Sequence, residues 1–171
     1  HMSRYDVETK KLEHGIKVRV VPDDSGATDS PFENGDSAVR FVEFSRRNGT
    51  YDSFHTGRND RSPFREPEEA LRWAKENRYI PYAVFKYEHS GVAYSVRPFS
   101  CPWDSGQAGY LFLSRKEWKR KSKRSDSYAE SAIKEFSAWA NGEIYGFIVE
   151  DESGETLDSC WGFIGDSDYC L

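Results

Sequence analysis

Two short segments hold most of the residues that could do chemistry, and each places a cysteine beside a tryptophan and an aspartate. The first is Pro98-Phe-Ser-Cys-Pro-Trp-Asp-Ser-Gly-Gln107, and the second is Asp158-Ser-Cys-Trp-Gly-Phe163. A cysteine can act as a nucleophile, bind a metal, or fill a buried position as a small apolar residue. The residues to assign are Cys101, Trp103, Asp104, Gly106, Asp158, Cys160 and Trp161.

A catalytic reading would make Cys101 the nucleophile, with His55 or His89 as its base. Proline follows Cys101 directly, whereas activated thiolates sit at helix N-termini or beside cations. Neither Cys101 nor Cys160 has an adjacent histidine or lysine. The pattern therefore favours a structural role, with both cysteines reduced and buried, Trp103 in the core, and Gly106 at a positive φ in a turn that Asp104 begins. A Cys/His-dependent hydrolase or transferase stays the alternative.

Metal and cofactor motifs are missing from the pattern. Structural zinc sites pair their ligands two to four residues apart, and no two Cys or His residues have that spacing. The chain has no CxxC, and its three cysteines are an odd number, which disfavours a disulfide framework. No glycine-rich phosphate loop is present. We therefore expect no metal and no cofactor, and the pattern favours a binding function over enzymatic turnover.

The strongest charge feature is a basic run from residue 115 to residue 124, in a chain whose formal charge is −5. Seven of its ten residues are Lys or Arg and one is Glu. Such a run predicts a contact surface for an acidic protein or for phosphates, and the alternative is a solvated helix face. Residues 141–171 hold eight Asp or Glu and no Lys or Arg. The cations of the run are Arg115, Lys116, Lys119, Arg120, Lys121, Lys123 and Arg124.

Hydrophobic periodicity predicts an α+β fold: one domain over residues 3–171, with a mostly antiparallel sheet and two main helices packed on one face. Residues 1–2 are a tag remnant, and the Gly-, Ser- and Asp-rich stretches 22–35 and 46–63 are expected to be surface loops. The turn around His89 to Gly91 should join 82–87 and 92–97 as a hairpin. The other expected strands are 16–21, 38–44, 109–113, 143–149 and 155–164, and in the last of these Cys160 and Phe163 should lie on opposite faces. The expected helices are 67–77, which Pro81 should stop, and 128–140, with Tyr128 on its apolar face. Ser114 is placed to cap a further helix after 109–113.

No apolar run is long enough to span a bilayer and no secretory leader is visible, so we expect a cytoplasmic protein without membrane contact. The aromatic content of 15% indicates a core built largely from rings.

Together with the segments around Cys101 and Cys160, the short motifs His89-Ser-Gly and Tyr145-Gly-Phe give the chain a family resemblance over about residues 80–168. It resembles a family of small accessory proteins encoded by bacteriophages and integrated mobile elements. The resemblance implies an anti-defence role inside a bacterial or archaeal host cell, including inhibition of CRISPR effectors. We therefore expect a non-enzymatic module that inhibits or modulates a host defence complex by stoichiometric protein–protein contact. A nucleic-acid-binding accessory protein is a further alternative.

Overall fold

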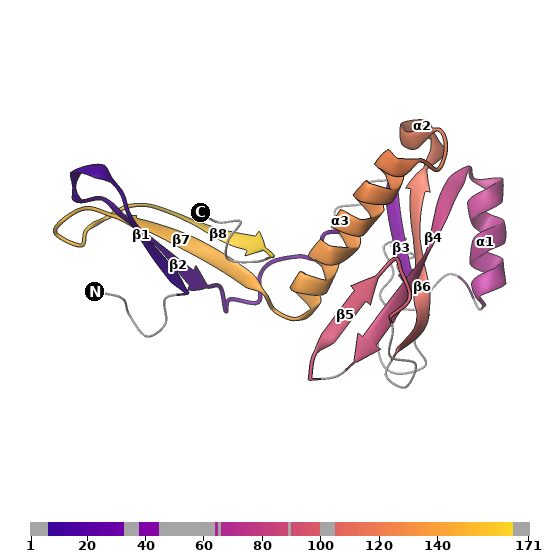
Figure 1. Ribbon diagram of the computed structural model, residues 1–171, viewed down its shortest axis with the longest axis horizontal. Helices are drawn as coiled ribbons and strands as arrows, with labels where there is room; N and C mark the ends of the chain where they lie inside the picture. Colours follow the sequence, from indigo (N-terminus) through magenta and orange to yellow (C-terminus); the bar gives the residue numbers. More distant parts are fainter. Residues whose placement is uncertain are drawn as a thin grey trace. The chain divides into compact units, whose positions relative to one another are not determined.

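The computed structural model describes residues 7–32, 38–44, 64, 66–88, 90–99 and 105–165 (Figure 1). The chain divides into two compact units: a terminal unit of residues 1–29 and 138–171, and a central unit of residues 30–137. Each unit contains an antiparallel sheet, and the helices lie mainly in the central unit. The predicted α+β class with antiparallel strands is confirmed, while two sheets replace the one expected. The assignment of 3–171 to a single domain stays a prediction.

The sheet of the terminal unit has the order β1-β2-β7-β8, and every neighbouring pair is antiparallel. Its strands are β1 (Glu8–Lys11), β2 (Lys17–Pro22), β7 (Ile144–Glu150) and β8 (Thr156–Ile164). Strands β2, β7 and β8 confirm sequence predictions. Strand β1 was not predicted, because ETKK is polar and lacks an apolar alternation. It forms by pairing with β2 at the margin of the sheet.

The sheet of the central unit has the order β3-β6-β4-β5, again antiparallel throughout. The pairing of β4 with β5, from Phe85 opposite Ser95 to Glu88 opposite Val92, confirms the predicted hairpin. Helix α2 follows the predicted cap at Ser114, and α3 begins five residues before the predicted Tyr128. The elements are β3 (Val39–Glu43), α1 (Pro67–Glu76), β4 (Tyr79–Glu88), β5 (Val92–Ser95), β6 (Ser105–Ser114), α2 (Arg115–Trp118) and α3 (Lys123–Ala140).

The two long helices pack on opposite faces of this sheet, and not on one face as the sequence predicted (Figure 1). On one face, Trp73 of α1 lies 5.7 Å from the ring of Phe112 on β6. On the other, Phe136 of α3 lies 4.8 Å from the ring of Phe41 on β3. Burial of the neighbours Phe41 and Val42 explains the arrangement, since successive residues of a strand point to opposite faces. Each face is apolar, so each needs its own helix.

Strand β4 contains Pro81, which had been expected to stop the preceding helix. The helix ends earlier, at Glu76, and Asn77 is its C-cap. Pro81 pairs with Phe112 on β6, whereas β5 joins the other side of β4 only from Phe85 onward. The proline therefore lies where β4 has one strand neighbour, a position at which its missing N–H removes no ladder bond.

Strand β6 contains two glycines in different surroundings. Gly109 pairs with Glu43, and a Cβ atom there would collide with the backbone carbonyl of Val42. Gly106 pairs with Lys86 and has open space where a Cβ would lie. The predicted turn role of Gly106 is wrong, because β6 extends four residues beyond its predicted start and takes Gly106 into its ladder with β4.

We expect Gly109→Ala to lower the free energy of unfolding by about 2 kcal/mol, because the methyl group would force β3 away from β6. Gly106→Ala, on the same strand, is the matched control and should change stability by less than about 0.5 kcal/mol. Urea unfolding of both variants checks this. Equal destabilisation by the two substitutions would contradict the close approach of β3 and β6.

Candidate functional site

The basic run lies on helix α2, the turn after it and the first residues of α3. Ser114 caps α2 as expected, because its hydroxyl accepts a hydrogen bond of 3.2 Å from the N–H of Lys116. Lys119 ends the helix with a positive φ of 59°, and its N–H donates to the carbonyl of Arg115. The run is thus a helix–turn–helix-start with defined backbone geometry.

The start of α3 is fixed by two serines and one tyrosine. The N–H of Ser125 donates to the Ser122 hydroxyl at 3.2 Å, and the N–H of Ser122 donates to the Ser125 hydroxyl at 2.8 Å. The fully buried Ser125 also lies 2.7 Å from the hydroxyl of Tyr82 on β4, which donates to Asp126. Burial raises the pKa of Tyr82 to about 12. These bonds tie the basic turn to the sheet.

Two cations of the run have partners. Lys121 forms a 2.9 Å ion pair with Asp126 and lies 5.4 Å from the ring centre of Tyr82. Hydrogen bonds from Lys121 and Tyr82 lower the pKa of Asp126 below its usual value. Arg115 donates to the carbonyl of Lys119 at 3.2 Å.

The other five cations of the run are exposed, and none has an ion-pair partner in the part of the chain that the structure describes. We call these five side chains the basic surface. Its members are Lys116, Lys119, Arg120, Lys123 and Arg124.

The charges of the two units have opposite sign. The central unit holds 19 Lys or Arg and 15 Asp or Glu, a formal charge of +4. The terminal unit holds five Lys or Arg and 14 Asp or Glu, a formal charge of −9. The acidity of the whole chain therefore resides in the terminal unit, and the basic surface belongs to a unit that is itself net basic.

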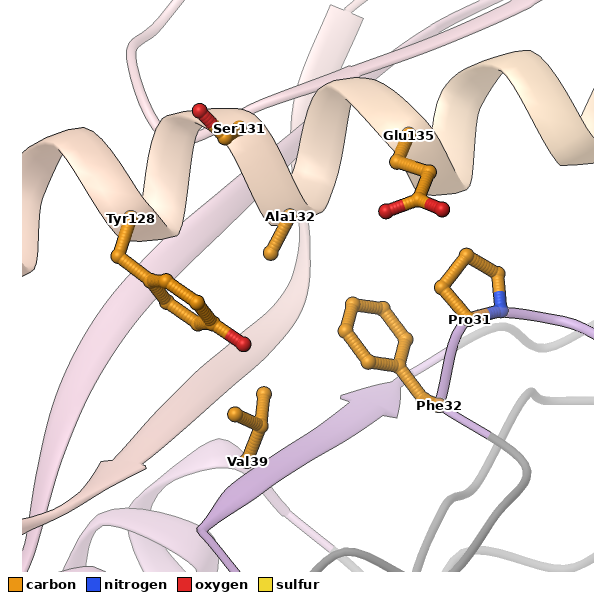
Figure 2. Close-up of a pocket in the computed structure, with 7 residues that line it drawn as sticks. All are labelled: Pro31, Phe32, Val39, Tyr128, Ser131, Ala132 and Glu135. Atoms are coloured by element: carbon orange, nitrogen blue, oxygen red, sulfur yellow. The ribbon is translucent and has the colours of Figure 1, made fainter. Parts of the chain in front are cut away.

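Aromatic side chains and a small pocket continue from the basic surface along α3. The rings of Trp118 and Tyr128 lie 4.7 Å apart, and Tyr128 is 42% exposed although its predicted place was on the buried face of the helix. Tyr128 also lines a pocket of about 170 Å³ between α3 and β3. Figure 2 shows the rings of Tyr128 and Phe32 on opposite sides of the hollow, with Ala132 and Val39 between them.

A buried charged cluster on the α3 face of the same sheet was missed by the sequence analysis. Glu43 is 5% exposed, and its carboxylate accepts hydrogen bonds from Lys86 at 2.7 Å and from the hydroxyl of Tyr94 at 3.1 and 3.2 Å. The signal was present in the sequence: Val39, Phe41 and Glu43 alternate on one face of the predicted strand 38–44, which places the glutamate inward.

The cluster shifts the pKa values of its members. Burial, together with the negative charge of Glu43, raises the pKa of Tyr94 to about 12. Burial opposes the charge of Lys86, but the hydrogen bonds to Glu43 and Glu88 still raise its pKa above the usual value. The cluster therefore keeps a lysine charged and a tyrosine neutral over a wide pH range, and both oxygens of Glu43 accept hydrogen bonds.

The second cysteine motif lies in β8, where a β-bulge changes its alternation. Tyr145 pairs with Phe163 but Phe147 pairs with Cys160, so the single residue between them on β7 lies opposite two residues of β8. Gly162 adopts a φ of 81° in the bulge, and its N–H donates to Asp23 at 3.0 Å. The bulge brings Phe163 onto the face of Cys160, opposite to its predicted face.

The bulge also explains the neighbouring Tyr145-Gly-Phe motif. The indole of Trp161 lies over Gly146, where a Cβ would collide with it, and the rings of Phe147 and Phe163 stack at 5.3 Å. Trp161 is nevertheless 50% exposed. Asp158 is exposed and accepts a hydrogen bond from the N–H of Ser159. These contacts give the motif a role in the pairing of β7 with β8.

The prediction that Cys160 is buried is wrong, because the cysteine is exposed on the last strand of the β1-β2-β7-β8 sheet. Most of the described buried hydrophobic residues lie instead in the central unit, whose sheet has a helix on each face. Cys101, Trp103, Asp104, His55 and His89 lie outside the described residues.

Among the described residues, no group of three or more His, Cys, Asp or Glu side chains could hold a metal ion. None of the described helices combines the length and the apolar character that crossing a membrane would need. Comparison of the chain with family models, curated protein sequences and solved structures finds no match.

The raised pKa of Tyr94 predicts a loss of stability in alkali. A group whose pKa is higher in the folded state stabilises the fold fully below its unfolded pKa, near 10, and this contribution disappears as the pH rises toward 12. Between pH 9 and pH 11 we expect the free energy of unfolding to fall by about 1 kcal/mol through this group. Tyr94→Phe should be less stable at pH 9 but should show a shallower decline, measured by urea unfolding. An unchanged slope in Tyr94→Phe would contradict the assignment.

The exposure of Cys160 predicts rapid alkylation of its thiol in the folded protein at pH 8. Mass spectrometry after brief treatment with iodoacetamide should find the label on Cys160, and Cys160→Ser should lose that labelled peptide. Stability should be nearly unchanged, since no packing is removed at an exposed position. Labelling of Cys160 only after addition of denaturant would show that the thiol is buried.

Proposed function

We propose that this chain is a non-enzymatic binding module of a phage or mobile element, which inhibits or modulates a host defence complex by stoichiometric contact through its basic surface. The observation that carries the proposal is the set of five exposed cations without ion-pair partners in the described chain, held on α2, the turn after it and the anchored start of α3. The anti-defence setting is supported by the family resemblance of the segment from about 80 to 168. That the target is a host defence complex is part of the same proposal.

The physical argument for a contact surface starts from repulsion. Five like charges between residues 116 and 124 raise the energy of the free protein, and an anionic partner relieves this repulsion when it binds. A flexible tail could spread such charges apart. Here the Ser114 and Ser122 caps and the Tyr82–Ser125 hydrogen bond hold the backbone, so the charges stay together. A pre-formed surface of this kind also loses less conformational entropy on binding than a flexible tail would.

The polar groups of the described chain have structural roles, and this favours a binding function over enzymatic turnover. Glu43 is the most enclosed carboxylate described, and it is occupied by Lys86 and Tyr94. The motif around the exposed Cys160 serves the β7–β8 pairing. The Cys/His-dependent enzyme remains the alternative, and its residues Cys101, His55 and His89 lie outside the described chain.

The proposal predicts that reversal of four charges, Lys119→Glu, Arg120→Glu, Lys123→Glu and Arg124→Glu, weakens inhibition by about tenfold or more, because each reversal turns an attraction into a repulsion. The melting temperature should change little, since these side chains are exposed. The measurement is phage plating efficiency on defence-proficient cells that express each variant. The control combines Arg72→Glu with Lys75→Glu on α1, which covers the other face of the same sheet, and should retain inhibition.

Stoichiometry separates the two classes of function. A binding module should inhibit the purified defence complex maximally near one copy per target, and Cys101→Ala should leave that titration unchanged. Inactivation at a small fraction of the target concentration, abolished by Cys101→Ala, would favour the enzyme instead.

A further inference from the structure

We infer that the anionic partner of the basic surface is a single strand of nucleic acid, whose phosphates lie on the basic surface and one of whose bases stacks on Tyr128 at the mouth of the α3–β3 pocket. The inference rests on the proposed function, because it names the partner of the same surface. Three features of the central unit support it: a continuous helix face, a place for a base, and the sign of the unit's charge.

The first feature is a continuous face of helix α3. Arg124, Tyr128, Ser131 and Glu135 follow one another at intervals of four, three and four residues, so they share one face of α3. All four are exposed. At 1.5 Å per residue, this face runs about 16 Å from the last cation of the basic surface to the far side of the pocket. A flexible strand can follow such a line from cation to ring to pocket.

The second feature is a place where a base of the strand can stack. Tyr128 offers an exposed ring whose centre lies 4.7 Å from that of Trp118, and sequence-tolerant stacking on exposed rings is how single strands are commonly held. Beyond the ring, Phe32, Val39 and Ala132 provide apolar walls. Figure 2 shows the carboxylate of Glu135 directed toward the pocket at the end away from Tyr128. A carboxylate there can accept a hydrogen bond from the exocyclic amino group of cytosine.

The third feature, the charge of the central unit, bears on the choice between a nucleic acid and an acidic protein. The net charge of −5 argues against nucleic acid when the chain is taken as a whole, but the unit that carries the basic surface has a charge of +4. An acidic protein would use the cations and would leave the aromatic pair and the pocket without a role. A single strand uses both, because it carries phosphates and planar bases on one chain.

The experiment measures fluorescence anisotropy of a labelled dC12 oligonucleotide with the full chain. If all five cations neutralise phosphates, the affinity should fall roughly a hundredfold between 50 and 200 mM salt. The reversal of Lys119, Arg120, Lys123 and Arg124 should abolish most of that salt dependence, and the Arg72→Glu, Lys75→Glu control should keep it. Tyr128→Ala should weaken binding by roughly tenfold, whereas Tyr128→Phe should bind as the unaltered chain does.

Two further probes decide the chemistry of the partner. A 12-base-pair duplex should bind more weakly than dC12, because its bases are stacked away from Tyr128. Glu135→Gln should reduce the preference for dC12 over dT12. A duplex that binds as tightly as dC12, together with no effect of Tyr128→Ala, would overturn the inference. An unchanged ratio of dC12 to dT12 in Glu135→Gln would overturn the placement of a base in the pocket.

Poly-L-glutamate separates failure of this inference from failure of the proposed function. If dC12 does not bind while poly-L-glutamate binds through the same four cations, the partner is an acidic protein and the proposed function stands. If neither probe depends on these cations, the basic surface is a solvated helix face and both proposals are overturned.

Discussion

The central unit depends on burying both faces of strand β6. Leu111, Phe112 and Leu113 are fully buried, although they point alternately to opposite faces of the sheet. One helix cannot cover both faces, so α1 packs against Phe112 through Trp73 and α3 packs on the other side through Phe136. This constraint places α3 along the sheet, and the position of α3 in turn sets where the basic turn and the α3–β3 pocket lie.

Polar contacts then fix details that apolar packing leaves open. The buried Ser125 joins the first turn of α3 to Tyr82 on β4, and the hydroxyl of Ser137 near its other end accepts a hydrogen bond from the N–H of Tyr94 on β5. Between them runs a buried stripe of Ala129, Ile133 and Phe136. Hydrogen bonds at both ends of an apolar stripe fix the helix along its length, since a shift by one turn would leave buried polar groups unpaired. The face that carries Arg124 and Tyr128 is thereby fixed as well.

The buried Glu43 is another polar group that depends on its hydrogen-bond partners. A carboxylate at 5% exposure is tolerated because Lys86 and Tyr94 both donate to it. Removing Lys86 would leave the charge of Glu43 without compensation, and removing the hydroxyl of Tyr94 would leave the carboxylate with one donor fewer. In the terminal unit, Asp23 accepts the N–H of Gly162 in the β8 bulge, and its hydrogen bonds with Ser25 lower its pKa. In the central unit, Glu43 accepts hydrogen bonds from two side chains at a charged position on an otherwise apolar strand face. In the terminal unit, Asp23 accepts a hydrogen bond from the backbone at the bulge of β8.

The sequence by itself determined the class of fold, most strands, the 82–97 hairpin and the Ser114 cap, because these follow from local periodicity and from turn and capping chemistry. It also located the basic run. Pairing between distant segments was decided only in the tertiary structure. The polar strand β1 exists through its ladder with β2, Gly106 became a strand residue through its ladder with β4, and the β8 bulge put Phe163 on the face of Cys160. Tyr128 was assigned to the buried face of α3 because periodicity cannot choose among nearby apolar positions, and contact with Phe41 and Tyr94 selected the stripe that ends at Phe136.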